Sequence, residues 1–166
     1  MQGRETILVV DDEVGPRESL RMILKPIYEV HTAGNGQEAL NFISEKKVDL
    51  VTLDLKMPGI SGIDVLKEIK KLQPDIDVII VTGYGTLSNA QEIMRYGAVD
   101  FISKPFNVAD IICIVSKAFQ RRRNNLKIKD LLEKIKVFRA AVHDTHKAEG
   151  IISENIQKAD FDPKNS

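Results

Sequence analysis

Ionisable and hydroxyl side chains stand at the ends of four short apolar runs of the sequence. They are Asp11 and Asp12 after residues 6–10, Asp54 after 48–53, Thr82 at the end of 77–82, and Lys104 after 99–103. A carboxylate at the end of an apolar run costs free energy unless a neighbouring group compensates for it. Three carboxylates that met would raise one another's pKa unless a cation lay between them. Mg²⁺ suits such a place, because it is held by a few carboxylates together with water and phosphate oxygens.

If these groups converge, they form a site for in-line phosphoryl transfer, with Asp54 as the nucleophile that becomes an aspartyl phosphate. Lys104 supplies a positive charge for a phosphoryl oxygen, and Thr82 supplies a hydroxyl donor. Each residue alone has a simpler explanation: an Asp pair is often a helix N-cap, Thr favours strands, and Lys-Pro is common in loops. Four strand ends that each hold a group required by one chemistry favour the functional interpretation.

The spacing of apolar residues predicts the elements that would bring these groups together. Five β-rich runs alternate with stretches of helical spacing, at residues 6–10, 28–32, 48–53, 77–82 and 99–103. Strands alternating with helices predict βαβ units and a parallel sheet covered on both faces. We therefore expect an α/β fold, a flavodoxin-like doubly wound five-stranded parallel sheet of order 2-1-3-4-5, with a C-terminal helical extension. In that order the first and third strands are neighbours, and ligands bind at the carboxyl ends of the strands.

Five segments at matching order and spacing resemble the receiver domains of two-component response regulators. They are VVDDE (9–13), TLDLKMPGISG (52–62), VTGYG (81–85), GAVDF (97–101) and SKPF (103–106). The resemblance extends over roughly residues 5–120. The spelling VTGYGT and the helix that follows are similar to receivers of regulators that activate the alternative sigma factor, sigma-54.

The resemblance implies that Asp54 is phosphorylated by a partner sensor histidine kinase. It implies that Asp12 and Asp54 bind Mg²⁺ with the backbone carbonyl of Lys56, and that Asp11 acts on the metal through water. Thr82 and Lys104 would contact the phosphoryl group.

Further residues receive roles in switching and in the lifetime of the phosphoryl group. Phe101 resembles the family's switch aromatic, whose ring turns inward when Thr82 moves toward the phosphate. The Lys104–Pro105 bond resembles the family's cis peptide. Lys56 and Tyr84 lie two positions after Asp54 and Thr82, and we expect both to tune hydrolysis of the phosphoryl group.

Charge divides the chain into two segments. Residues 1–120 hold 13 Lys or Arg and 17 Asp or Glu, a net charge of −4, whereas residues 121–166 hold 11 and 7, a net charge of +4. We expect a receiver domain over 1–120 and a helical linker or short coiled coil with a disordered end over 121–166. The single cysteine, Cys113, excludes an internal disulfide and is expected in a helix core. No stretch reaches membrane-spanning length, so we expect a cytoplasmic protein without membrane contact.

The second segment predicts protein contacts. Ile128, Leu131, Ile135, Phe138 and Val142 follow the 3-4 spacing of a coiled coil, and a helix that folds back on the domain fits the same residues. A homodimer is expected through this helix or through the face formed by the fourth helix, fifth strand and fifth helix. Direct nucleic-acid binding by the run Arg121–Arg123 is not expected, because no aromatic residues interleave. A metal site at His143 and His146 lacks further ligands.

The function predicted from the sequence is a phosphorylation-controlled switch, not a conventional enzyme, that catalyses only its own phosphorylation and dephosphorylation. If the chain is part of a longer regulator, it would control a transcription-activating domain. The alternative is a metal-dependent phosphatase of the haloacid-dehalogenase type, which places its nucleophile after the first strand as D-x-D. A passive scaffold is a third interpretation, and the intact set of Asp11, Asp12, Asp54, Thr82 and Lys104 argues against it.

Overall fold

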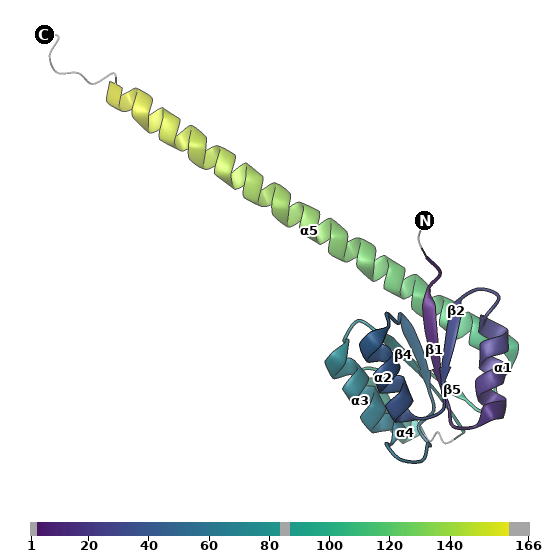
Figure 1. Cartoon of the computed structure of the whole chain (residues 1–166). Helices are drawn as coiled ribbons and strands as arrows, with labels where there is room; N and C mark the ends of the chain where they lie inside the picture. The colour runs from purple at the N-terminus through teal and green to yellow at the C-terminus, as the bar shows by residue number, and fades with distance from the viewer. Residues whose placement is uncertain (1–2, 84–86, 160–166) are drawn as a thin grey trace, which may run out of the picture. The chain divides into compact units, whose positions relative to one another are not determined.

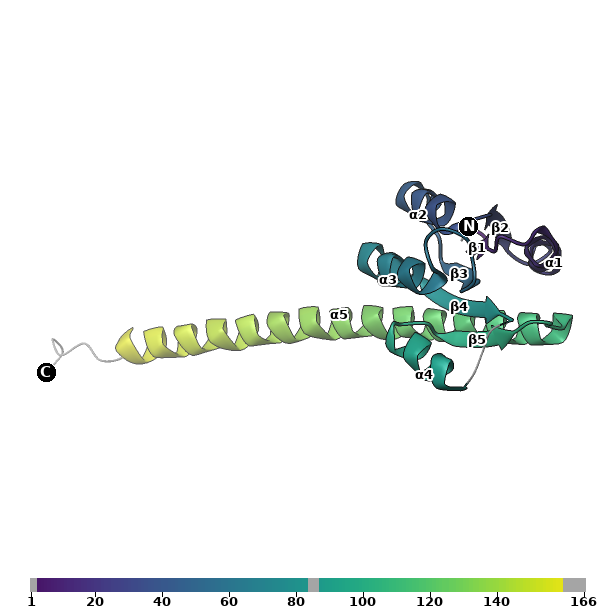
Figure 2. The same ribbon diagram turned by 90° about the horizontal axis from the view of Figure 1, so that it is seen from below.

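The protein contains a five-stranded parallel sheet with helices on both of its faces (Figures 1 and 2). The computed structural model describes residues 3–83 and 87–159, and it describes side chains at 3–83 and 90–142. By its internal contacts the chain divides into two units, Met1–Arg121 and Arg122–Ser166. The first unit contains the sheet and is considered first.

The sheet has the strand order β2-β1-β3-β4-β5, which confirms the predicted doubly wound topology. The strands are β1 Thr6–Val10, β2 Glu29–Ala33, β3 Leu50–Leu53, β4 Asp77–Thr82 and β5 Asp100–Ser103. Every residue of β3 is buried, as expected for a central strand that is covered on both faces. The β2, β3 and β5 runs begin one or two residues later than the sequence pattern indicated, and β2 ends one residue later.

Helices on the two faces enclose two separate apolar cores. The helices are α1 Val14–Leu24, α2 Gly36–Glu45, α3 Gly62–Leu72, α4 Leu87–Arg95 and α5 Val108–Ala159. One core joins the sheet to α2, α3 and α4, through residues such as Ile43, Leu66 and Ile93. The other joins it to α1 and the first turns of α5, through residues such as Leu20 and Phe119. The side chains of successive strand residues point alternately into these two cores.

Local signals fix where the helices begin and end. The side chain of Asn35 accepts a hydrogen bond of 2.9 Å from the backbone N–H of Glu38 at the start of α2. Ser61 does the same for Asp64 at the start of α3, at 3.2 Å. Both residues are favoured N-caps, because their oxygen satisfies an N–H that has no partner inside the helix. Gly97, with a φ of +98°, takes a left-handed conformation after α4.

Helix α5 is continuous from Val108 to Ala159 and therefore extends through the second unit. Its first turns correct one prediction, because Cys113 is exposed and does not lie in the core. Ile111 and Val115 face the core, and Cys113 lies two residues from each. At about 100° per residue this places Cys113 on the opposite side of the helix. Among the described residues no helix is long and apolar enough to cross a membrane.

Candidate functional site

Strand pairing places the predicted site residues at one edge of the sheet. Val10 is paired with Leu53, so Asp11 and Asp54 follow neighbouring strands at the same level. The backbone N–H of Asp54 donates to the carbonyl of Val10 at 3.0 Å, which continues the hydrogen bonding between β1 and β3 as far as Asp54. On the other side of β3, Leu53 pairs with Ile80, and the last residue of β4 is Thr82. The carboxyl ends of β1, β3 and β4 therefore bring these side chains together.

The three aspartates form a cluster that has the composition of a cation site. One oxygen of each of Asp11, Asp12 and Asp54 lies within 4.8 Å of the others. Oδ1 of Asp12 is buried and has no hydrogen-bond partner among the residues that the structure describes. A buried carboxylate oxygen without a partner is costly, and a hard cation with oxygen ligands would relieve that cost. The residues present therefore fit Mg²⁺.

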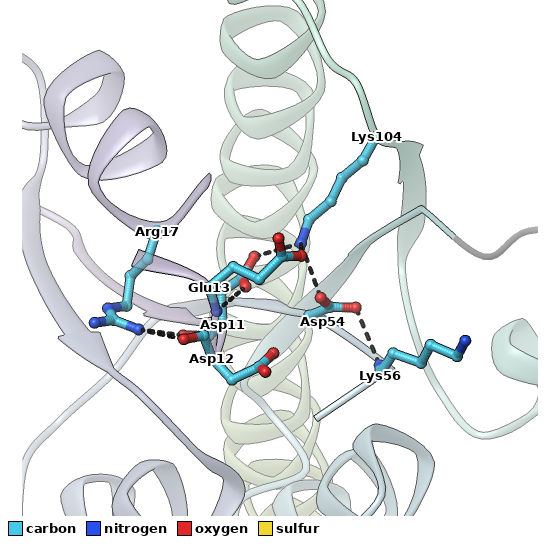
Figure 3. Close-up of polar contacts among 7 residues, drawn as sticks. All are labelled: Asp11, Asp12, Glu13, Arg17, Asp54, Lys56 and Lys104. Carbon is cyan, nitrogen blue, oxygen red and sulfur yellow. Dashed lines mark hydrogen bonds and ion pairs between the residues drawn. The ribbon is translucent and has the colours of Figure 1, made fainter. Parts of the chain in front are cut away.

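Lys104, which follows β5, is the cation that contacts this cluster (Figure 3). Its Nζ lies 2.7 Å from Oδ2 of Asp11, 2.8 Å from Oδ2 of Asp54 and 3.5 Å from Oε1 of Glu13. The backbone N–H of Lys104 donates to the carbonyl of Thr82 at 3.0 Å, and the Lys104–Pro105 peptide is cis, as the sequence resemblance implied. Through its ammonium and its backbone N–H, Lys104 thus connects the ends of β1, β3 and β4.

Burial and ion pairing shift the pKa values of Asp11 and Lys104 in opposite directions. Burial raises the pKa of the Asp11 carboxyl above its usual value, and the hydrogen bond from Lys104 offsets part of this rise. For Lys104, burial alone would lower the pKa, but hydrogen bonds to Asp11 and Asp54 outweigh it and raise the pKa to about 12. The ammonium is therefore charged at neutral pH.

Asp54 is held by the loop that follows it. Its side chain is only 4% exposed, and Oδ1 accepts a hydrogen bond of 3.1 Å from the backbone N–H of Lys56. Gly62, the first residue of α3, packs against this loop, and a Cβ there would lie 2.4 Å from the carbonyl oxygen of Asp54. The side chain of Lys56 is exposed and lines the mouth of the site.

Two residues of the β1–α1 region belong to the site and were not predicted. Arg17 donates from Nη1 to the backbone carbonyls of Asp11 at 2.6 Å and Asp12 at 3.3 Å (Figure 3). It therefore fixes the loop that presents both aspartates. Glu13 donates its N–H to Oδ1 of Asp11 at 2.9 Å and turns its own carboxylate toward Lys104. The sequence offered a signal only for Glu13, as the third member of the acidic run.

These groups line one pocket with a volume of about 670 Å³. Besides the predicted residues Asp12, Asp54, Lys56, Thr82 and Lys104, its walls are formed by Glu13, Pro16, Ser19, Gly83, Pro105 and Phe106. Thr82 is buried at the wall, with 1% of its surface exposed. Asp54 therefore lines a pocket whose walls are partly apolar.

Phe101, the predicted switch aromatic, is not among the residues that line this pocket. Phe101 is half-buried and packs against the core beneath α2, α3 and α4. Strand β4 lies between its strand, β5, and β3, which precedes Asp54. Tyr84, predicted to tune hydrolysis, falls outside the described residues. The side chains of His143 and His146 also fall outside them.

Comparison with known proteins identifies the same family along most of the chain. Residues 7–116 match the family described as the response regulator receiver domain. Sporulation initiation phosphotransferase F of Bacillus subtilis is 40% identical over 121 residues, which cover 72% of this chain and 98% of that protein. The transcriptional regulatory protein ZraR of Klebsiella oxytoca is 38% identical over 125 residues, covering 74% of this chain and 28% of that protein.

Solved structures agree with the sequence relatives. A CheY-like receiver domain from Methanospirillum hungatei superposes with a TM-score of 0.71 at 31% identity, covering 74% of this chain and 99% of that one. NtrX from Brucella abortus superposes with a TM-score of 0.74 at 35% identity, covering 78% of this chain and 30% of that one.

The relatives fall into two lengths. The chain spans nearly all of the phosphotransferase but less than a third of ZraR and NtrX. ZraR, AtoC and NtrX are regulators of the sigma-54-activator type, which confirms the resemblance seen in the sequence. The comparisons give no support to a phosphatase of the haloacid-dehalogenase type. The chain belongs to the response regulator receiver domain family of two-component signalling proteins.

Proposed function

We propose that the chain accepts a phosphoryl group on Asp54 from a sensor histidine kinase. The environment of Asp54 supports this most directly. Its carboxylate is buried, is paired with Lys104 at 2.8 Å and lines a pocket. An oxygen of Asp54 attacks phosphorus, the nitrogen–phosphorus bond of the donor breaks, and its electron pair returns to the histidine ring. The chain is the acceptor of this reaction and, apart from its own phosphorylation and dephosphorylation, not an enzyme.

The surrounding residues stabilise the charge that arrives with the phosphoryl group. Lys104 lies within reach of any oxygen bound to Asp54 and replaces its contact with the carboxylate by one with the phosphoryl oxygens. Thr82, at the pocket wall, donates its hydroxyl to a second oxygen. Asp12, Asp54 and the carbonyl of Lys56 would hold Mg²⁺, with Asp11 acting on it through water, and the bound ion would neutralise part of the negative charge on the phosphoryl group.

The kinase approaches through the mouth of the pocket. Pro16 and Ser19 of α1 form part of that mouth, and the neighbouring Val14 is 63% exposed. A donor histidine that reaches Asp54 must therefore bring its own protein surface against the first turns of α1. Exposed apolar side chains at such a position favour protein contact.

Phosphorylation changes a protein surface through Thr82 and Phe101. The phosphoryl group adds negative charge at Asp54, which attracts the hydroxyl of Thr82 toward the pocket. Strand β4 pairs with β5, with Ile80 opposite Phe101 and Thr82 opposite Ser103, so movement of Thr82 leaves space that the ring of Phe101 enters. The face formed by α4, β5 and the first turns of α5 then changes its partners, including a second copy. The action is cytoplasmic, and within a longer regulator it controls a transcription-activating domain.

The test is the intact mass of the chain after incubation with Mg²⁺ and acetyl phosphate. We expect wild type and Asp75→Asn, a change at an exposed aspartate, to gain one phosphoryl group, and Asp54→Asn to gain none. Omission of Mg²⁺ abolishes the gain. Equal labelling of Asp54→Asn and wild type would show that Asp54 is not the acceptor. A Thr82→Ala variant that is labelled yet gives the full change in partner binding would contradict the coupling route.

A further inference from the structure

The part of α5 in the second unit has an exposed apolar stripe. Six side chains lie along one side of the helix and are 38–70% exposed: Ile128, Leu131, Leu132, Ile135, Phe138 and Val142. Apart from the adjacent pair Leu131 and Leu132, successive members are separated by three or four residues. This spacing repeats every seven residues, with Ile128, Ile135 and Val142 at the a positions and Leu131 and Phe138 at the d positions of a coiled coil. Large apolar side chains in such a row gain free energy when a partner helix covers them.

The charges beside the stripe are basic. The positions that border the a and d residues are g, occupied by Lys127 and Lys134, and e, occupied by Leu132 and Arg139. The b positions lie next to the e positions, one step farther from the stripe, and are occupied by Lys129 and Lys136.

Acidic residues lie on the other side of the helix. Asp130 and Glu133 are turned away from the stripe and pair within the helix, with Lys134 at 2.7 Å and Lys136 at 2.8 Å. Such exposed pairs contribute little and do not remove the positive field along the stripe. Over residues 122–142 there are seven Lys or Arg and two Asp or Glu, a net charge of +5. A partner that covers the stripe must approach this field.

A second copy of the chain is a poor partner for the stripe. In a parallel pair, each g residue faces the e residue five positions later on the other helix, so Lys134 would face Arg139 of the second copy. In an antiparallel pair, g faces g and e faces e, which again opposes Lys to Lys and Arg to Arg. Like charges at these positions destabilise pairing and discriminate against the partner that carries them.

We propose that the stripe binds an acidic helix, forming a heterotypic coiled coil with a partner that carries Asp or Glu at its e and g positions. The apolar side chains supply the driving force, and Lys127, Lys134 and Arg139 select the partner by charge. This interaction is separate from the phosphorylation of Asp54 and is tested without it.

The experiment uses the full chain and two synthetic peptides with identical Ile and Leu at a and d. One peptide has Glu at every e and g position and the other has Lys. We expect the fluorescence anisotropy of the labelled Glu peptide to report binding at least tenfold tighter than that of the Lys peptide. The difference should shrink as salt rises from about 0.05 M to 0.5 M, because salt screens exposed charges. Sedimentation of the chain alone should show a monomer at the same concentration.

A charge-reversal pair provides the control. Lys127→Glu/Lys134→Glu should remove or invert the preference for the Glu peptide. Lys46→Glu/Lys47→Glu changes the net charge equally at two exposed residues after α2 and should leave the preference intact. Equal binding of both peptides, an equal effect of the two double variants, or a salt-resistant homodimer would overturn the proposal. Binding to phosphatidylglycerol vesicles without binding to the Glu peptide would overturn it in favour of a lipid surface.

Discussion

The ammonium of Lys104 lies 2.8 Å from Oδ2 of Asp54, although 50 residues separate the two in the sequence. The same nitrogen lies 2.7 Å from Oδ2 of Asp11. Lys104 therefore contacts carboxylates that a divalent cation would also use, and the two cations would compete for them. The proposed phosphorylation of Asp54 would end this competition, because the phosphoryl oxygens could contact both cations.

Replacing Lys104 by Met should separate metal binding from phosphoryl acceptance. Loss of the ammonium leaves the three aspartates without their cation, so Mg²⁺ should bind about tenfold more tightly. Labelling by acetyl phosphate should slow by at least tenfold, because no ammonium meets the phosphoryl oxygens. Isothermal titration with MgCl₂ and labelling kinetics measure the two effects. Lys71→Met, at a lysine whose side chain is 71% exposed, is the control and should change neither. Weaker Mg²⁺ binding in Lys104→Met would contradict the competition.

Asp11→Asn should stabilise the fold at neutral pH in the absence of metal. Burial raises the pKa of Asp11 in the folded state above its usual value of 3.8, so the folded protein holds this proton more tightly than the unfolded chain. Stability is therefore lost as pH rises from the usual pKa of the carboxyl through its raised pKa in the folded state. Removing the charge should raise the free energy of unfolding by on the order of 1 kcal/mol at pH 7, and by progressively less toward pH 3.

Thermal unfolding in EDTA at several pH values measures this difference. Asp75→Asn, at an exposed aspartate, should show no such pH-dependent gain. Added Mg²⁺ should stabilise wild type more than Asp11→Asn, since a ligand that binds only the folded state raises its stability. An Asp11→Asn variant that is less stable than wild type at pH 7 would show that the ion pair with Lys104 outweighs burial.

The sequence was sufficient to predict the fold and the convergence of the charged groups, because both follow from strand periodicity and strand order. Asp11 and Asp54 meet since β1 and β3 are neighbours, and Thr82 and Lys104 join them at the same edge. The position of Cys113 was predicted wrongly. Apolar neighbours on both sides of a residue indicate a core position only when the residue also lies on the buried side of the helix, and Cys113 does not.

Contacts of long, flexible side chains could not be predicted in this way. Arg17 is one of two arginines in α1, and nothing in its sequence surroundings indicates that it binds the carbonyls of Asp11 and Asp12. The same holds for the close packing of Gly62 on the loop after Asp54, which depends on how α3 lies against β3. Such details are set by tertiary packing and are absent from local patterns.

Glu13→Gln should accelerate phosphorylation by small anionic donors. The carboxylate of Glu13 lines the pocket and lies 3.5 Å from Lys104, so it repels a dianion that approaches Asp54 and weakens the field of the ammonium. We expect the initial rate with acetyl phosphate to rise about threefold to tenfold at low salt, and the gain to fall as salt screens the charge. Glu45→Gln, at an exposed glutamate at the end of α2, is the matched control. An equal rate in Glu13→Gln and wild type would show that the donor does not pass Glu13.

Gly62→Ala should damage the proposed phosphorylation site through the backbone alone. An alanine Cβ at this position would lie 2.4 Å from both the carbonyl oxygen of Asp54 and Cα of Leu55, so α3 and the loop must move apart. Overpacking of this kind costs about 1–3 kcal/mol, and here the displaced atoms include those that aim the Asp54 carboxylate. Unfolding in urea should show that loss, and labelling by acetyl phosphate should be slower than wild type even in the fully folded fraction.

Gly15→Ala is the matched control, because a Cβ at Gly15 meets nothing within 4 Å, and alanine in an exposed helix should be neutral or stabilising. Labelling of Gly62→Ala at the wild-type rate would show that the loop can shift without moving Asp54.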